Sequence, residues 1–186
     1  MIEESDYRQA DFDKFLKIFF DATSHVGEDY FQVLVADGEN PLYRERVYCY
    51  ELYHCIRELM NWDASYQLDG ELDKAGHPLI HKDVGSVKPD FLVHQHGEMN
   101  NNIVAIEVKP INVSKDKIKK DISTLCKFLE FAHYYRAIYL VYGREDEIDK
   151  FLRVVEEKVA NIPGNSFYLV WHKRVGDPAK IIWVYP

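Results

Sequence analysis

The chain has 186 residues, and its 31 acidic side chains outnumber its 23 lysines and arginines, which leaves a formal net charge of −8 at pH 7. Hydrophobic residues make up 47% of the sequence and aromatic residues 14%, which supplies a packed core and excludes a disordered, collagen-like or low-complexity chain as the main state. No apolar run approaches the roughly 20 residues of a membrane helix, and the N-terminal segment is acidic where a signal peptide would be basic and then apolar. We therefore expect one domain over residues 1–186, in a soluble protein of the cytoplasm.

Three cysteines occur, Cys49, Cys55 and Cys126, and no pair has a C-x-x-C spacing. This argues against a disulfide framework and against a thiolate zinc site. The acidic balance argues against a protein that passively coats nucleic acid, because such binding relies on cationic side chains. It does not exclude an enzyme that acts on nucleic acid through bound metal ions, since carboxylate ligands themselves make a protein acidic.

Helical and strand-like patterns alternate along the chain. Phe12, Phe15, Leu16 and Phe19 recur at helical spacing, whereas residues 30–35 form a strand-like run. In chain order the patterns predict a helix over 5–22, a strand over 29–37, a helix over 42–60, a strand near 65–68, strands over 89–94 and 103–109, a helix over 114–134, a strand over 137–142, a helix over 145–160, and strands over 167–172 and 180–185. This order indicates an α/β fold with a mixed sheet.

The strand over 103–109 ends in two charged side chains. Because side chains alternate across a strand, Glu107 and Lys109 share one face, about 6.6 Å apart along the backbone from two rises of about 3.3 Å. The rest of this strand is apolar, and a charge in such a place needs a partner or a metal ion. The pair therefore marks a functional site, unless the strand end simply emerges into water.

Asp90 follows Pro89 at the start of the preceding strand. The polar connection over 96–101 predicts a hairpin, which would bring Asp90 alongside Glu107. Two carboxylates with a lysine beside them are suited to holding a hard cation and placing a water molecule near a phosphate. The alternative is that Pro89 and Asp90 only start the strand, since proline tolerates that position and aspartate favours turns.

A third carboxylate comes from the helix over 42–60. Glu51 lies at a spacing of four from Val47 and Cys55, within the apolar stripe of this helix, where a glutamate is unusual. It is either part of the same site or paired with Arg44 or Arg57 at the edge of the stripe.

Pro89-Asp90 and Glu107-Val108-Lys109, each on a strand of a hairpin, resemble the motif of the PD-(D/E)-x-K nuclease superfamily. The resemblance covers about residues 42–143. It implies a restriction-endonuclease-like core of helix, strand, strand, strand, helix and strand, to which this chain adds an N-terminal helix and a C-terminal helix and strands. In that superfamily a glutamate on the first core helix often completes the metal site, and Glu51 falls where it would be expected.

The resemblance implies phosphodiester hydrolysis, with DNA as the expected substrate and defence, repair or mobile-element processing as the setting by analogy. Asp90, Glu107, the Val108 carbonyl and Glu51 would hold Mg²⁺, for which Mn²⁺ can substitute, and Lys109 would orient or help to deprotonate the attacking water. A homodimer is a further expectation, because cutting two strands needs two sites. The competing hypothesis is a non-catalytic protein-interaction module that retains the fold.

Five lysines are candidates for contacting the nucleic-acid backbone. Four of them gather where the helix over 114–134 begins, at the end of a helix that favours anions, and one lies in the preceding histidine- and lysine-rich loop. The alternative is a solvated helix face on which the lysines pair with Asp116 and Asp121. The candidates are Lys88, Lys115, Lys117, Lys119 and Lys120.

Histidines raise a separate zinc hypothesis. His94 and His96 stand two apart and so share a face of a strand, and His77 and His81 could supply further nitrogen ligands. No cysteine is nearby and no spacing matches a known zinc pattern, so the sequence favours the carboxylate site over this one.

Overall fold

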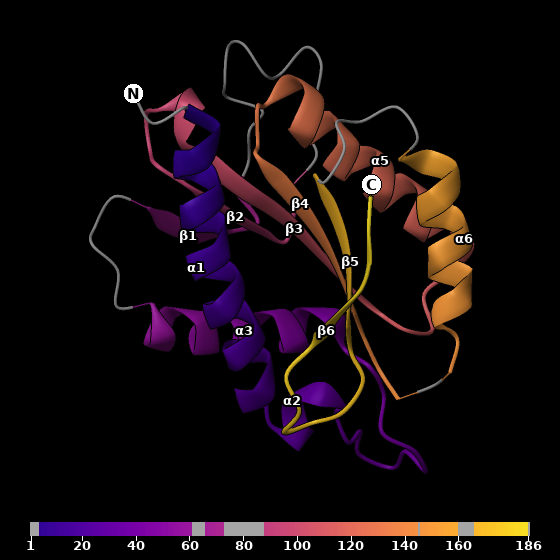
Figure 1. The fold of residues 1–186 in the computed structure, drawn as a ribbon. Helices are drawn as coiled ribbons and strands as arrows, with labels where there is room; N and C mark the ends of the chain where they lie inside the picture. Colours follow the sequence, from indigo (N-terminus) through magenta and orange to yellow (C-terminus); the bar gives the residue numbers. More distant parts are fainter. Residues whose placement is uncertain (1–3, 61–65, 73–87, 145, 160–165, 186) are drawn as a thin grey trace.

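The computed structural model describes residues 4–60, 66–72, 88–144, 146–159 and 166–185, and within them it has five α-helices and six strands (Figure 1). The predicted mixed α/β class is confirmed. The helices are α1 (Glu4–His25), α2 (Glu28–Phe31), α3 (Glu45–Leu59), α5 (Lys115–Phe131) and α6 (Ile148–Lys158). The strands are β1 (Gln67–Gly70), β2 (Phe91–His94), β3 (Asn102–Pro110), β4 (Arg136–Tyr142), β5 (Phe167–His172) and β6 (Lys180–Val184).

All six strands belong to one mixed sheet, in the order β1-β2-β3-β4-β5-β6. The first three strands are antiparallel, and the register that pairs Phe91 with Ile106 and Val93 with Val104 confirms the predicted hairpin. Strands β3, β4 and β5 are parallel, because α5 and α6 carry the chain back between them, and β6 closes the sheet antiparallel to β5. Neighbours in sequence are thus neighbours in the sheet throughout.

An apolar layer covers each face of the sheet. Helices α1 and α3 pack against each other on one face, and α5 and α6 pack together on the other (Figure 1). Strand β3 serves both layers because its side chains alternate: Val104, Ile106 and Val108 enter the layer of α1 and α3, while Ala105 enters the layer of α5 and α6. Such two-sided burial explains why this strand reads as an almost unbroken apolar run.

The predicted strand over 29–37 is wrong. The segment begins with the short helix α2, and its strand character is limited to a single bridge between Val33 and Leu42. Phe31 is fully buried against the ring of Tyr48, whereas Leu34 is 76% exposed, so only one side chain of the run has a core to enter. An apolar run without a neighbouring strand to pair with does not extend a sheet.

The other predicted elements agree with the structure to within a few residues. The helix predicted over 42–60 begins at Glu45, and the strand predicted near 65–68 is β1. The ends of the helix predicted over 145–160 lie outside the described residues. None of the described helices has the length and apolar character needed to cross a membrane.

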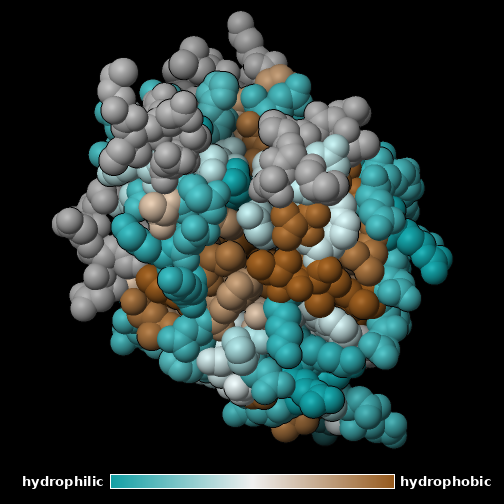
Figure 2. Space-filling view, viewed as in Figure 1, coloured by the Kyte–Doolittle hydropathy of each residue, from teal (hydrophilic) through white to brown (hydrophobic). Residues whose placement is uncertain are grey.

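Strand β6 is the outer strand of the sheet beyond β5. Apolar side chains gather on the molecular surface around this strand (Figure 2), and Ile181 and Ile182 of β6 are 40% and 36% exposed. This edge is therefore the most apolar part of the face that Figure 2 presents.

His172, at the end of β5, is fully buried among aromatic rings. Its Nδ1 shares a hydrogen bond of 2.7 Å with the hydroxyl of Tyr48, and the Tyr48 ring stacks on Tyr142 at 3.9 Å between centroids. Burial lowers the pKa of His172 from its ordinary 6.5 to about 4. The imidazole is therefore neutral in the folded protein at neutral pH.

We expect His172 to contribute to the loss of stability in acid. The histidine of the unfolded chain becomes protonated below pH 6.5, whereas the folded one stays neutral down to about pH 4. The free energy of unfolding should therefore fall across this range by up to about 3 kcal/mol. His172→Asn keeps an acceptor for Tyr48 and does not titrate, so its fall should be shallower. Urea unfolding of both proteins from pH 7 to pH 4 measures the difference, and equal slopes would show that His172 is not responsible.

Candidate active site

A buried lysine at the end of β3 is surrounded by carboxylates. Lys109 is 7% exposed, and the four carboxylate groups around its ammonium come from α3, from the residue before β2, from β3 itself and from α5. The distances from Nζ are 3.0 Å to Glu45, 3.3 Å to Glu107, 3.4 Å to Asp90 and 4.0 Å to Asp121. We call these five residues the Lys109 cluster.

The hairpin positions three members of the cluster, as the sequence predicts. Glu107 and Lys109 are two apart on β3 and share a face. Asp90 directly precedes β2, one position before the pairing of Phe91 with Ile106, which sets it opposite Glu107. Its Oδ2 accepts a hydrogen bond of 2.7 Å from the backbone N–H of Val108. The backbone N–H of Val108 therefore holds Asp90 against β3, beyond the point where the pairing of β2 with β3 ends.

The helix carboxylate of the cluster is Glu45, and the structure does not bring Glu51 to it. Glu45 is the first residue of α3, and its Oε1 accepts a hydrogen bond from the ammonium of Lys109. Glu51 is six positions further, which is about 9 Å along the axis and roughly 240° around it, and its negative charge acts instead on the thiol of Cys55, whose pKa is raised first by burial and then by that charge. The first residue of α3, and not its apolar stripe, contacts the cluster. A position within the stripe therefore does not identify the glutamate that joins the site.

Asp121 is the member that sequence reasoning missed. The sequence offers it only as a surface partner, in the alternative interpretation of the lysine group, but α5 turns it inward, where it also lies 3.4 Å from the hydroxyl of Tyr139 on β4. Its side chain is only 14% exposed. The available signal was its place one position before Ile122, on the flank of the buried stripe of α5.

The cluster holds four negative charges for one positive charge when all groups are ionised. Burial, with the charge of Asp90, raises the pKa of Glu107 well above its usual value, and Lys109 only partly opposes this. Burial likewise raises the pKa of Asp121 to about 6. For Lys109 burial acts to lower the pKa, but the carboxylates of Asp90 and Glu107 prevail and raise it, so this side chain stays protonated at neutral pH.

The donors of the cluster fit a hard divalent cation. Carboxylate oxygens are the ligands that Mg²⁺ and Mn²⁺ prefer, and four of them meet here with an excess of negative charge. The Val108 carbonyl is a further oxygen, because in a strand it points to the same side as its N–H, which binds Asp90. Asp90, Glu107 and this carbonyl are thus grouped at the end of β3, with Glu45 and Asp121 flanking them.

The predicted lysine group lies beside the cluster. On α5, Lys115, Lys117 and Lys120 are exposed, whereas Lys119 lies 3.9 Å from Glu157 of α6. Lys117 stands four residues before Asp121 and so lies on the same side of the helix. For these four lysines the described part of the chain contains no ion pair with Asp116 or Asp121, which leaves the pairing alternative without support. The fifth candidate, Lys88, is exposed two residues before Asp90.

A hollow of about 370 Å³ adjoins the cluster at Asp90. It is lined by Asp90 and Phe91 and by Cys49, Tyr50 and Tyr53 of α3. Tyr50 is 62% exposed at the rim. A flat, partly apolar ligand group could therefore rest beside the carboxylate of Asp90.

We expect Asp121→Asn to stabilise the protein when divalent cations are removed. Above pH 6 the ionised Asp121 is less favourable in the fold than in the unfolded chain, so neutralising it should raise the free energy of unfolding, on the order of 1 kcal/mol after solvent screening. The gain should vanish as the pH falls from about 6 towards 4, where the wild-type aspartate takes up its proton.

Denaturant unfolding in EDTA at pH 8 and pH 4 measures this effect. Asp116→Asn on the same helix is the matched control, since that side chain is exposed and its loss should not stabilise the protein. A stabilised control, or an Asp121→Asn variant that is weaker at pH 8, would contradict the expectation.

Comparison with known proteins adds no assignment. No protein-family model matches the chain, and no relative was found among curated proteins. The Lys109 cluster and its surroundings are therefore the basis for inferring function.

Proposed function

We propose that this protein is a metal-dependent nuclease that hydrolyses phosphodiester bonds in DNA. One observation carries the proposal: Asp90, Glu107 and Lys109 converge at the end of β3, with two more carboxylates within 4.0 Å of the ammonium. This is the constellation that the PD-(D/E)-x-K resemblance implies. The order α3, β1, β2, β3, α5, β4 also follows the helix, strand, strand, strand, helix, strand order of a restriction-endonuclease-like core, which we propose for this region.

Asp90, Glu107 and the Val108 carbonyl would hold Mg²⁺, or Mn²⁺ in its place, and Glu45 takes the role that the sequence assigned to Glu51. When bound, the ion would polarise the phosphate and lower the pKa of a coordinated water. The raised pKa values of Glu107 and Asp121 support this assignment. Carboxylates that are buried close together are unfavourable when ionised, and a bound cation relieves this cost as a proton does.

Lys109 supplies a fixed ammonium in this arrangement. Since its carboxylate neighbours keep it protonated, it would donate hydrogen bonds to the attacking water or to a phosphate oxygen and stabilise the negative charge that builds on the phosphate. Its contacts with Glu45, Asp90 and Glu107 restrict its position, so the donor is preorganised.

The substrate path follows from the charges and rings around the cluster. Lys115, Lys117 and Lys120 stand at the start of α5 and would attract the phosphate backbone towards a site that is otherwise negative. In the hollow beside Asp90, Tyr50 and Tyr53 offer rings on which a base could stack. Lys119, paired with Glu157, is less available for this role.

Cutting both strands of a duplex would require two copies of the chain. Each chain supplies one Lys109 cluster, and two strands need two sites. The apolar surface around β6 is the part of the described molecule best suited to such a contact, with Ile181 and Ile182 exposed on an edge strand (Figure 2). We therefore include a homodimer in the proposal.

The proposal predicts metal-dependent cleavage that needs three side chains. Labelled duplex, single-stranded and branched DNA, together with RNA, should be incubated with Mg²⁺, Mn²⁺ or EDTA. Cleavage should require a metal ion, and Asp90→Asn, Glu107→Gln and Lys109→Met should each slow it at least about 100-fold. Cleavage in EDTA, or by all three variants at the wild-type rate, would refute the assignment.

The absence of cutting with either metal has a defined meaning only if binding is measured as well. If neither cation raises the melting temperature of the wild-type chain, the Lys109 cluster is structural and the interaction-module hypothesis takes its place. Circular dichroism of each variant checks that a loss of activity does not come from a loss of folding.

Two glutamates on the same helix provide a sharper test of the geometry. Glu45→Gln removes a carboxylate from the Lys109 cluster, so it should reduce Mg²⁺-dependent cleavage about tenfold or more and weaken the apparent Mg²⁺ affinity. Glu51→Gln makes the same chemical change away from the cluster and should stay within about twofold of wild type. Initial rates across a Mg²⁺ titration measure both, and the reverse ranking would restore Glu51 as the helix ligand.

A further inference from the structure

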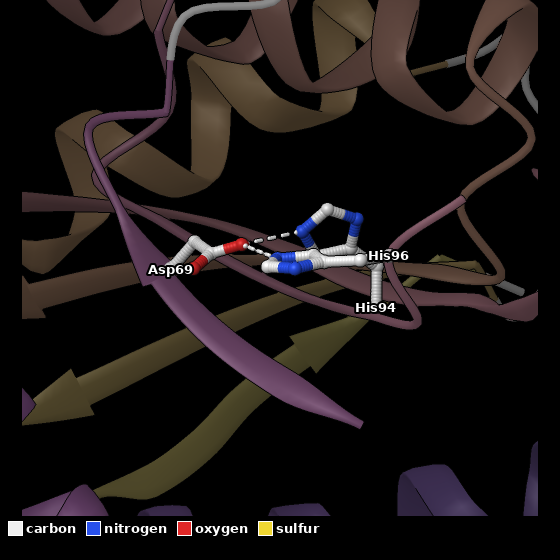
Figure 3. Close-up of side chains that lie close together, drawn as sticks. All are labelled: Asp69, His94 and His96. Carbon is white, nitrogen blue, oxygen red and sulfur yellow. Dashed lines mark hydrogen bonds and ion pairs between the residues drawn. The ribbon is translucent and has the colours of Figure 1, made fainter. Parts of the chain in front are cut away.

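A second group of side chains that could hold a metal ion lies at the opposite end of β2 from Asp90. Asp69 of β1, His94 at the end of β2 and His96 just beyond it point towards one another (Figure 3). The Nε2 atoms of His94 and His96 lie 2.7 Å and 2.6 Å from the same oxygen, Oδ2 of Asp69. One ligand atom from each residue lies within 4.8 Å of the other two.

Strand pairing explains why these residues meet. Gln67 is paired with His94 and Asp69 with Leu92, so Asp69 and His94 lie on the same face of neighbouring strands. His96 follows in the turn from Gln95 to Glu98, where the N–H of Glu98 donates to the Gln95 carbonyl at 3.3 Å.

Two features of this turn direct His96 towards the group. Gly97 has a φ of +83°, a conformation that glycine adopts without strain. The backbone N–H of His96 donates to the side-chain oxygen of Gln67 at 3.1 Å, which attaches the turn to β1. The three side chains are therefore placed by β1, by β2 and by a turn bonded to β1.

The donor set is suited to a transition metal and differs from that of the Lys109 cluster. Two imidazole nitrogens and one carboxylate oxygen are typical ligands of Zn²⁺ and of other divalent transition metals, whereas Mg²⁺ prefers oxygen ligands alone. Ligand atoms around a tetrahedral zinc ion are about 3.4 Å apart for bonds of about 2.1 Å. The distances from Asp69 Oδ2 to the two Nε2 atoms need to increase by less than 1 Å to reach this spacing. The side chain of His96 is 59% exposed and able to move.

A buried hydroxyl beside the group supports a bound ligand. Tyr134 is 3% exposed, its ring lies 6.3 Å from that of His94, and its hydroxyl has no hydrogen-bond partner among the described residues. Burial and then the negative charge of Asp69 raise the pKa of Tyr134, so the phenol lies within electrostatic reach of that carboxylate. A water molecule on a metal ion at this place would give the hydroxyl a partner.

We propose that Asp69, His94 and His96 bind one divalent transition-metal ion of the zinc class, with the fourth position open to water. The ion would join the edge strand β1 to the end of β2 and to the turn after it, so we assign it a structural role at this edge of the sheet. The site is separate from the Lys109 cluster, because Asp90 and His94 are four residues apart on an extended strand, about 13 Å at 3.3 Å per residue.

Metal titration of the full chain tests this proposal. Protein freed of metal with EDTA and then dialysed should bind one equivalent of Zn²⁺, with a rise in melting temperature, and an excess of Mg²⁺ should not compete. Co²⁺ in place of Zn²⁺ should give a visible absorption spectrum, and X-ray absorption at the zinc edge should show two imidazole ligands and oxygen.

Matched variants locate the site. His96→Gln removes an exposed side chain and so should leave the fold intact by circular dichroism, yet weaken Zn²⁺ binding at least about tenfold and abolish the cobalt spectrum. His54→Gln, at another exposed histidine on α3, should leave both unchanged. Absence of Zn²⁺ binding by the wild-type chain, or equal binding by His96→Gln, would overturn the proposal.

A final variant keeps this test independent of the proposed nuclease. Glu107→Gln alters the Lys109 cluster and should bind Zn²⁺ as the wild-type chain does. If Glu107→Gln loses Zn²⁺ binding while His96→Gln retains it, the ion binds at the Lys109 cluster and the Asp69 site is refuted. Both outcomes are measured as Zn²⁺ binding, so a loss of nuclease activity by itself changes neither of them.

Discussion

The burial of a positive charge at the end of β3 is the constraint on which the arrangement of the molecule depends. Lys109 is only 7% exposed, and a buried ammonium is tolerated only when opposite charges meet it. Those charges come from α3, from the start of β2, from β3 and from α5. The hairpin, the helix that crosses to β4 and the helix on the opposite face therefore all meet at this lysine.

The compensation exceeds what the lysine needs. A single ammonium calls for one or two partners, yet four carboxylates surround it, and burial raises the pKa of both Glu107 and Asp121. Removing one partner of a buried pair is costly, but an excess of like charge is also costly. Proteins retain such local conflicts mainly at functional sites, where a ligand resolves them. A divalent cation would resolve this one, which is why the cluster supports a catalytic proposal better than a purely structural role.

One sheet face carries the two groups for which we propose different metal ions. The group at the start of β2 is built from oxygen atoms, and the group at its end combines two imidazoles with one carboxylate. The short strand β2 separates them, and on this face its buried residue Leu92 lies between them. Because ligand type and not affinity alone selects a metal, the two groups need not compete for the same ion.

The local patterns in the sequence predicted the parts of the fold that depend on near neighbours. Alternation in β3 put Glu107 and Lys109 on one face, and the polar connection before β3 predicted the hairpin that brings Asp90 to them. His94 and His96 also lie together, but β2 ends at His94, and the turn after it, not strand alternation, places His96. These relations hold because they follow from the period of a strand and from a short turn, which any structure of this chain must respect.

Relations between distant elements could be decided only by the tertiary structure. The crossing of α3 over the sheet decides that Glu45, at the end of the helix, reaches Lys109 and that Glu51 does not. The packing of α5 turns Asp121 inward, and the pairing of β1 with β2 supplies Asp69 to the histidines. A sequence determines which residues share a face of one element, but the tilt, depth and neighbour of that element are set by packing across the whole core, because burial is non-directional and many orientations satisfy the same apolar pattern.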